Sequence, residues 1–260
     1  MARDTYYSPL PDLDSLAPDQ PRGAMAGIAF EPAEQLRYLR EELGPYLSEL
    51  EIPEHGAAGE LHLRNHSYEA FDLETLYATV RRRRPARVLE IGSGFSTRVI
   101  AAALAANGAG VHRVVDPFAA DDLEGLAEVT RGSAAAIADG EFAELAAGDV
   151  LFVDSTHVVA RGSEVNRVVL DALPVLARGV AVHFHDVFLP WDYPYSYFAH
   201  HRMFINEQYL LQAFLALNRA YSVLLGTHAI GRLYPQEVAE LVPSVRNGAA
   251  PCAFWIERTA

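Results

Sequence analysis

Short apolar segments alternate with longer amphipathic ones through most of this chain. Four apolar runs have the length of a strand: 87–91, 111–116, 150–154 and 180–186. The stretches between them have helical spacing over 97–106 and 164–177. Short apolar strands separated by helices are typical of a parallel sheet that is covered on both faces. The pattern therefore predicts an α/β fold.

The remaining elements are less regular. Three more helices are expected, at 68–83, 121–130 and 206–218. Three more strands are expected, at 134–138, 221–225 and 253–258. Residues 226–251, between the last two strands, have no clear periodicity apart from a short helix near 236–241.

The N-terminal part lacks this alternation. Residues 1–30 are rich in Pro, Asp, Ser and Gly and predict an arm. A helix is expected over 32–50, with a kink or break at Pro45, because apolar residues recur at helical spacing at Leu36, Leu39, Leu43 and Leu47. We therefore divide the chain into an N-terminal arm and helical cap, 1–67, and an α/β domain, 68–260.

Composition excludes several classes of protein. The net charge is −13 and all 21 basic residues are arginines, which argues against nucleic acid as a partner. The basic run 81–84 is expected to be a solvated helix end. No apolar run approaches the roughly 18 residues of a membrane span, and no signal peptide is visible, so a cytoplasmic protein without a membrane partner is expected. The single Cys252 excludes an internal disulfide.

Two further expectations follow from composition and from the arm. The alanine-rich, arginine-only composition suggests a bacterial source. The arm could pack against a second copy of the chain, which would make the protein a homo-oligomer.

The most informative motif follows the first predicted strand. Residues 88–97 read Val-Leu-Glu-Ile-Gly-Ser-Gly-Phe-Ser-Thr and run directly into a helix. A strand, a glycine turn and a helix together bring backbone N–H groups to a bound ligand. Thr97 replaces the third glycine of the dinucleotide fingerprint, which argues against an NAD-dependent dehydrogenase. Glu90 stands two residues before Gly92.

This segment resembles motif I of the class I S-adenosylmethionine-dependent methyltransferases, hydrophobic-hydrophobic-Glu/Asp-hydrophobic-Gly-x-Gly. The resemblance implies that the methyl donor binds at this turn. The implied donor-binding residues here are Glu90, Gly92, Ser93, Gly94 and Ser96.

Polar residues also follow the other predicted strands, whose carboxyl ends form the ligand crevice of a doubly wound sheet. Asp116 follows the glycine turn at roughly the spacing, about 20 residues along the chain, at which an acid can accept hydrogen bonds from ribose hydroxyls of a bound ligand. The alternative is that Asp116 only caps the turn before Pro117. Asp154 ends the fourth strand, where it could contact the donor, and His157 follows three residues later.

The fifth strand reads Val-His-Phe-His-Asp. By strand alternation His183 and His185 share one face, and Asp186 lies at the exit. We expect His183 to be a core residue. The other polar side chains are expected to converge, since burying them unpaired would be costly.

A longer, ordered set of segments extends the resemblance. Residues 148–157, 162–166, 173–190 and 206–211 resemble the bacterial class I family labelled methyltransferase domain 24. Its patterns there are close to Asp-Ser-Ser-His, His-x-His-Asp-hydrophobic-Phe-x-Pro and Asn-Glu-Gln-Tyr. The likeness runs from about Tyr68 to the C-terminus. It implies a Rossmann-like class I methyltransferase fold, a seven-stranded mostly parallel sheet with helices on both faces, here with an N-terminal helical extension.

Related small-molecule O-methyltransferases, of the catechol and macrolide-sugar kinds, suggest roles for the strand-end residues. By position, the metal ligands implied here are Asp154, His185 and Asp186, and the implied general base is His157. His185 departs from the acid or amide of those enzymes, and a His/Asp set suits Mn, Fe or Zn at least as well as Mg. The alternative is a metal-free cluster with His157 or His185 as the base.

We therefore expect an S-adenosylmethionine-dependent O-methyltransferase that acts on a small-molecule acceptor. Methyl transfer is an in-line displacement in which alignment supplies much of the rate and a histidine removes the acceptor proton. The alternatives are N- or C-methylation, or a donor-binding protein without catalysis, which could dispense with His157, His185 and Asp186.

Two further segments are candidates for the acceptor site. Residues 189–204 hold many aromatic side chains, which fits either an acceptor pocket or lid or ordinary packing over the sheet. Asn65 and His66 either reach the pocket or cap the following helix.

Overall fold

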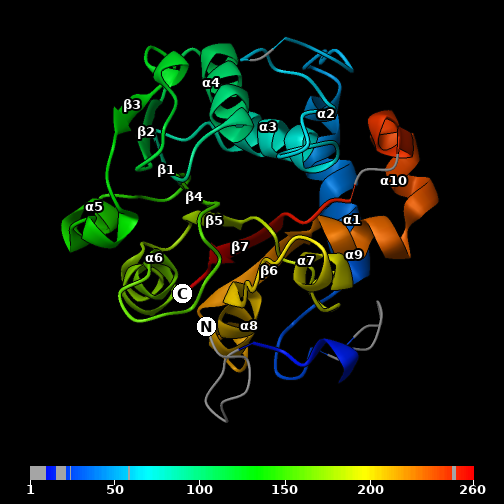
Figure 1. The fold of residues 1–260 in the computed structure, drawn as a ribbon. Coiled ribbons are helices and arrows are strands. Elements are labelled where there is room, and N and C mark those ends of the chain that lie inside the picture. Colours follow the sequence, from blue (N-terminus) through cyan, green and yellow to red (C-terminus); the bar gives the residue numbers. More distant parts are fainter. Residues whose placement is uncertain (1–9, 16–21, 24, 58, 248–249) are drawn as a thin grey trace.

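The structure is a computed structural model and describes residues 10–15, 22–23, 25–57, 59–247 and 250–260. One seven-stranded sheet has the order β3-β2-β1-β4-β5-β7-β6, and only β7 runs antiparallel to its neighbours. The expected Rossmann-like, mostly parallel sheet is confirmed (Figure 1). Its strands are β1 (Arg87–Ile91), β2 (Val111–Val115), β3 (Glu128–Thr130), β4 (Val150–Val153), β5 (Ala181–Phe184), β6 (Tyr221–Gly226) and β7 (Phe254–Arg258).

The strand order reverses between β1 and β4, which is where ligands bind in open α/β sheets. The register aligns the carboxyl ends of the central strands, because Ile91 pairs with both Val115 and Val153, and Val153 pairs with Phe184. The residues that follow these strands therefore lie along one edge of the sheet.

Helices cover both faces of the sheet (Figure 1). One face packs against α1 (Pro32–Tyr38), η2 (Leu39–Leu43), α2 (Gly44–Leu47), α3 (Asp72–Arg83) and α4 (Phe95–Asn107). The other packs against α5 (Asp139–Ala143), η5 (Arg167–Ala172), η6 (Leu173–Val175) and α8 (Glu207–Leu215). The short α6 (Glu164–Asn166) leads into η5.

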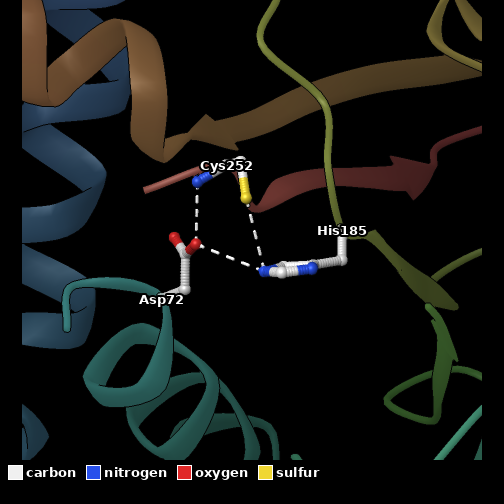
Figure 2. A group of neighbouring side chains, drawn as sticks. All are labelled: Asp72, His185 and Cys252. Atoms are coloured by element: carbon white, nitrogen blue, oxygen red, sulfur yellow. Dashed lines mark hydrogen bonds and ion pairs between the residues drawn. The ribbon is translucent and has the colours of Figure 1, made fainter. Parts of the chain in front are cut away.

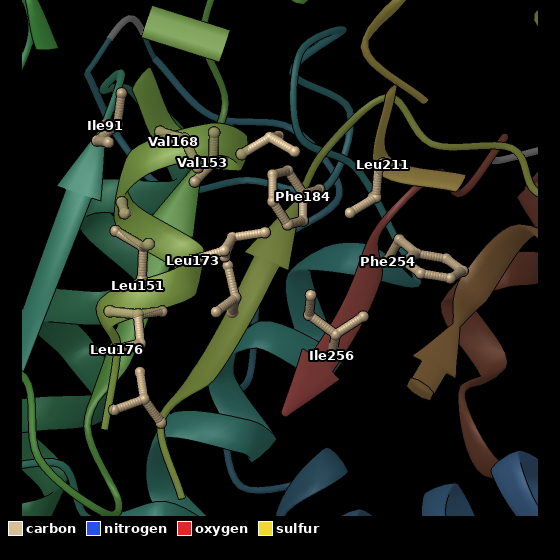
Figure 3. Close-up of a cluster of buried hydrophobic side chains, with 14 of the residues drawn as sticks. Ile91, Leu151, Val153, Val168, Leu173, Leu176, Phe184, Leu211, Phe254 and Ile256 are labelled. Carbon is tan, nitrogen blue, oxygen red and sulfur yellow. The ribbon is translucent and has the colours of Figure 1, made fainter. Parts of the chain in front are cut away.

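Strand alternation divides the buried side chains between the two cores. In β4, Phe152 contributes to the α3–α4 side, while Leu151 and Val153 contribute to the other. Figure 3 shows this second core, in which Leu173 and Leu176 pack against β4 and β5. Buried apolar side chains therefore anchor the sheet to the helices on both faces.

The N-terminal helical extension is present. The expected helix of residues 32–50 is α1, a π-helical turn η2 and then α2, with Pro45 in the first turn of α2. A proline at that place needs no hydrogen bond from its nitrogen. Leu39 and Leu43 are fully buried against α3. The division at residue 67 stays a prediction.

Only parts of the predicted arm are described. Residues 1–9, 16–21 and 24 lie outside the described residues. The short η1 (Leu13–Ser15) is described, Met25 is buried in the sheet core, and the ring of Phe30 stacks on Phe254 with centroids 6.4 Å apart.

The third strand was predicted in the wrong place. It is Glu128–Thr130, whereas the expected strand at 134–138 is the turn η4 (Ala134–Ala136), capped by Ser133. The expected helix at 121–130 is only η3 (Asp121–Leu123), since Gly125 adopts a positive φ of 95° soon after it. A three-residue strand offers too short a pattern to distinguish it from a helix end.

The segment between the last strands is more regular than predicted. It forms α9 (Thr227–Leu233), α10 (Pro235–Leu241) and η7 (Pro243–Asn247). The helix α9 was missed because its glycine and β-favouring residues are poor helix formers, whereas tertiary burial of Ala229 and Ile230 stabilises it. Among the described residues, no helix has both the length and the apolar character to cross a membrane.

Candidate functional site

The glycine turn after β1 lies directly against the end of β4. Gly92 has a φ of 90°, and a Cβ placed there would lie 1.8 Å from the carbonyl oxygen of Asp154. Only glycine fits this contact, because a side chain would be strained as well as overlapping. Gly94, with open space around it, is the N-cap of α4, and its N–H donates to Thr97 Oγ1 at 3.0 Å. The turn thus opens onto the sheet edge.

Glu90 and Ser96 hold this turn from inside the protein. Glu90 is fully buried and accepts a hydrogen bond from Ser96 Oγ at 2.6 Å, and His112 Nε2 lies 2.7 Å from its other oxygen. Both carboxylate oxygens are therefore occupied by neighbours. The donor-binding role predicted for Glu90 and Ser96 stays a prediction; their visible contacts are internal.

Asp116 lies beside the turn, at the end of β2. Ser93 Oγ donates to its Oδ2 at 2.5 Å, and the N–H of Phe118 donates to its Oδ1 at 2.8 Å. The second bond is the turn cap that the sequence left open as an alternative, and it exists together with the link to the glycine turn. The ring of Phe118 is 91% exposed next to this carboxylate.

His157 lies among three carboxylates. Its Nδ1 is 2.9 Å from Glu207, and its Nε2 is 3.2 Å from Asp154 and 3.5 Å from Asp186. Burial alone would lower the pKa of His157, but Asp154 and Glu207 raise it to about 10. His157 is therefore an imidazolium at neutral pH, and it holds these carboxylates together.

His185 belongs to a second group, shown in Figure 2, with Asp72 from the start of α3 and Cys252 just before β7. Its Nε2 lies 3.4 Å from Cys252 Sγ and 3.6 Å from Asp72 Oδ2, while its Nδ1 is 3.5 Å from Asp154. Burial alone would lower the pKa of His185, but Cys252, Asp154 and Asp72 raise it well above its ordinary value. Burial raises the pKa of the Cys252 thiol to about 12.

Asp154 links the two groups. One of its oxygens faces His157 and the other faces His185. Burial would raise the pKa of Asp154, but the two histidines hold it far below its usual range. Because of this lowered pKa the carboxylate is ionised. Its side chain is 29% exposed, so the carboxylate is accessible at the sheet edge.

A cavity of about 490 Å³ opens in front of these residues. Asp154, His185 and Asp186 line it together with Asp72 and Cys252. His157 is not among its lining residues and lies behind Asp154 and Asp186. The predicted metal ligands Asp154, His185 and Asp186 are thus neighbours, but their donor atoms are divided between two groups, Asp154–His157–Asp186 and Asp72–His185–Cys252.

The aromatic segment 189–204 is divided between ordinary packing and the wall of the cavity. Trp191, Tyr193 and Phe198 are packed in a buried cluster. In contrast, Tyr197 in α7 (Tyr195–Ala199) lines the cavity and donates a 2.8 Å hydrogen bond to Asp186. His201, which follows α7, also lines the cavity.

Asn65 and His66 also differ from each other. Asn65 Oδ1 accepts hydrogen bonds from the N–H groups of Ser67 and Tyr68 at 2.9 and 2.7 Å, which is a turn cap. His66 lines the cavity. His183 is fully buried, stacked on Phe152 with ring centroids 4.1 Å apart, and burial lowers its pKa to about 3, as fits the expected core residue.

Sequence reasoning missed Asp72, Cys252 and Glu207 as site residues. Glu207 lies in the Asn-Glu-Gln-Tyr segment, so the resemblance contained a signal for it. The sequence predicted Asp72 to be part of a helix that covers the sheet, and it indicated only an isolated thiol at Cys252. No local pattern connects these two with His185, since the three are far apart in the chain.

Comparison with known proteins agrees with this arrangement. Residues 89–187 match the model of a family described as a methyltransferase domain. An uncharacterized protein of Archaeoglobus fulgidus is 30% identical over 104 residues, which is 36% of this chain. The match spans about half of that relative, 47% of its length.

Two solved structures are similar at lower identity. The O-methyltransferase TomG of Streptomyces achromogenes, involved in tomaymycin synthesis and solved with SAM, is 18% identical with a TM-score of 0.50, over 87% of this chain and 99% of TomG. An O-methyltransferase of Bacillus cereus in complex with SAH is 14% identical with a TM-score of 0.46, over 84% of this chain and 97% of that one.

At such identity the likeness to TomG shows the fold alone, whereas the family match covers the strands that carry the glycine turn, Asp116, Asp154 and His185. Residues 89–187 therefore match a methyltransferase domain, and they lie in a Rossmann-like α/β fold similar to that of TomG.

Proposed function

We propose that the protein transfers the methyl group of S-adenosylmethionine to a hydroxyl oxygen of a small molecule. The observation that carries this proposal is the position of Asp154. Its carbonyl oxygen packs against Gly92 of the glycine turn, and its side chain lines the cavity. A donor at the turn and an acceptor in the cavity would therefore be adjacent, as in-line transfer requires.

The donor would bind along the glycine turn. The similar fold of TomG binds SAM, and here the turn presents the start of α4 beside Asp116. Asp116 would accept hydrogen bonds from ribose hydroxyls while Ser93 holds it in place. The exposed ring of Phe118 would pack on the adenine.

The acceptor would bind in the cavity. A volume of about 490 Å³ suits a small molecule, and the polar groups that line it, Asp154, Asp186 and His185, suit a hydroxyl more than an apolar carbon. Nucleic acid is a poor acceptor for a chain with a net charge of −13.

We assign His157 a positioning role in place of the general base expected from the sequence. It lies behind the carboxylates and is protonated, with a pKa of about 10, so it has no free nitrogen for the acceptor proton at neutral pH. The acceptor hydroxyl would instead donate to Asp154 or Asp186, which His157 orients. His185 lines the cavity, where its ring would form part of the wall beside the acceptor.

A divalent metal on Asp154, His185 and Asp186 fits this geometry poorly. Asp154 and Asp186 face the His157 imidazolium, and His185 Nε2 faces Asp72 and Cys252. No step of the proposed reaction is therefore assigned to a metal on these three residues.

Calorimetric titration with S-adenosylmethionine and with NAD tests the proposal. We expect micromolar binding of the methyl donor and no response to NAD. Asp116→Ala should weaken donor binding by about 10²- to 10⁴-fold, since two hydrogen bonds to a charged group, about 1.5–3 kcal/mol each, are lost. Asp171→Ala, at an exposed site on η5, serves as the matched control and should bind as the wild type does. Absence of donor binding would refute the proposal.

The acceptor class is tested with a radiolabelled methyl donor and a panel of phenols, catechols and sugars. We expect label in one class and loss of transfer in Asp154→Asn with donor binding retained. Transfer only to amines or carbon acids would contradict O-methylation.

A further inference from the structure

The group of Asp72, His185 and Cys252 has the composition of a transition-metal site. It offers one carboxylate oxygen, one imidazole nitrogen and one sulfur, and all three side chains are buried. Cys252 is the single cysteine of the chain. Sulfur and imidazole favour zinc and similar transition metals, whereas magnesium and calcium favour oxygen ligands.

Two distances in this group are close to those of a tetrahedral site. Zn–S bonds of about 2.3 Å and Zn–N or Zn–O bonds of about 2.0–2.1 Å at tetrahedral angles separate ligand atoms by about 3.3–3.6 Å. His185 Nε2 lies 3.4 Å from Cys252 Sγ and 3.6 Å from Asp72 Oδ2. The third pair also lies within 4.8 Å. The three atoms therefore surround a point that one ion can occupy (Figure 2).

Neighbouring groups hold the ligands in these orientations. Thr227 Oγ1 donates to Asp72 Oδ1 at 2.5 Å, and the Cys252 N–H donates to Asp72 Oδ2 at 2.7 Å. His185 Nδ1 lies 3.5 Å from Asp154 Oδ2, which directs the opposite nitrogen toward Asp72 and Cys252. Metal-binding histidines typically donate their second N–H to a carboxylate in this way.

Three protein ligands leave one tetrahedral position open. Asp72, His185 and Cys252 all line the cavity, so an ion bound to them would lie beside the space proposed for the acceptor. A catalytic zinc site has this form, with three protein ligands and a fourth position for water or substrate.

We propose that Asp72, His185 and Cys252 bind one divalent transition metal of the zinc class. Binding forms three metal–ligand bonds, displaces the thiol proton of Cys252 and the Nε2 proton of His185 to solvent, and leaves Asp72 ionised. This site differs from the Asp154, His185 and Asp186 set expected from the sequence, because it uses Asp72 from α3 and Cys252 before β7.

Its use in catalysis rests on the proposed function. Asp72, His185 and Cys252 would hold the metal beside the cavity, where it would supply a Lewis acid that lowers the pKa of an acceptor hydroxyl. The released proton would go to solvent or to the nearby Asp186, which lines the same cavity.

Cobalt(II) is the probe for this site, because a thiolate bound to cobalt gives an intense charge-transfer absorption that nitrogen and oxygen ligands do not give. Full-length protein stripped with a chelator is titrated with Co²⁺ and followed by absorption, with zinc content measured separately by elemental analysis. We expect one equivalent of Co²⁺ to bind with the thiolate band, and Zn²⁺ to displace it.

Variants assign the ligands. Cys252→Ser should abolish the thiolate band and weaken Co²⁺ binding by about 100-fold, and Thr227→Val should weaken it by about 10- to 100-fold through Asp72. His55→Gln, at an exposed histidine, is the matched control and should bind as the wild type does. Circular dichroism of each variant establishes that it is folded.

The outcomes separate this inference from the proposed function. The proposed site would be overturned by Co²⁺ binding without a thiolate band, or by a band that persists in Cys252→Ser. Binding lost only in His157→Gln would also overturn it, because the ion would then lie at Asp154, His157 and Asp186. Donor binding by calorimetry is measured on metal-free protein. Donor binding without metal binding leaves the proposed function standing and refutes the metal site. Metal binding without donor binding refutes the proposed function and leaves the metal site standing.

Discussion

Replacing Gly92 by alanine tests whether the glycine turn and the cavity are connected through Asp154. In the structure the new Cβ would lie 1.8 Å from the carbonyl oxygen of Asp154, and it would have to adopt a φ of 90°. Because the nearest atom is backbone, no side-chain rotation relieves the overlap. The turn and the end of β4 must separate.

The expected cost has two parts. A non-glycine residue in such a conformation costs about 1–3 kcal/mol. Overpacking at a site that cannot rotate away costs about another 1–3 kcal/mol. We therefore expect Gly92→Ala to lower the free energy of unfolding by about 2–6 kcal/mol, a large fraction of the roughly 5–15 kcal/mol of a typical domain.

Donor affinity should fall in the same variant. The backbone N–H groups of the turn would move with it, and each 1.4 kcal/mol of lost contact is about tenfold in affinity. We expect S-adenosylmethionine to bind at least about tenfold more weakly. Urea unfolding gives the first quantity, and calorimetric titration of the folded variant gives the second.

Gly140→Ala is the matched control. Gly140 lies in α5, and a Cβ there would meet nothing within 4 Å. Its substitution should change stability by no more than about 1 kcal/mol, in the stabilising direction. The reasoning about the turn would be refuted if Gly92→Ala had the unfolding midpoint and donor affinity of Gly140→Ala.

Three further outcomes follow from the site. First, the stabilisation from the His157 imidazolium should be complete below its unfolded pKa of about 6.5 and disappear as the pH rises through about 10. Urea unfolding between pH 7 and 10.5 should show a falling free energy of unfolding, and the fall should be smaller in His157→Gln. Equal falls in the two proteins would contradict the ion-pair network. Second, methyl transfer should fall over the same alkaline range if His157 positions Asp154 and Asp186, whereas a rise through about pH 10 would restore it as the base. Third, Phe118→Ala should leave stability unchanged because the ring is 91% exposed, yet weaken donor binding by about 1 kcal/mol; unaltered affinity in the titration would remove the ring from the donor site.

Much of the fold could be predicted from local patterns. The central strands are short apolar runs, and β1, β2, β4 and β5 lie within two residues of the expected ranges because both faces of a parallel sheet are buried. The strand β3 was misplaced since three partly exposed residues carry little periodic signal. The helix α9 was missed since its stability comes from packing and its residues have weak helix propensity.

The sequence by itself determined the chemistry at each strand end. A glycine turn after β1 and acids after β2, β4 and β5 must meet at one edge, because parallel strands in register end together. The convergence of Asp116, Asp154 and Asp186 on that edge could therefore be anticipated from order along the chain.

Only the tertiary structure decided which side chains face one another. The resemblance implied His157 as the general base and His185 as a metal ligand, but the sequence did not reveal the partners of either imidazole. In the fold, Glu207 and Asp186 surround the first, whereas Asp72 and Cys252 surround the second. Asp186 follows β5, whereas Asp72, Glu207 and Cys252 come from α3, α8 and the segment before β7, and their approach depends on how helices pack across the sheet. Side-chain contacts of such long range leave no periodic trace in the sequence, so the division of the site into two groups required the structure.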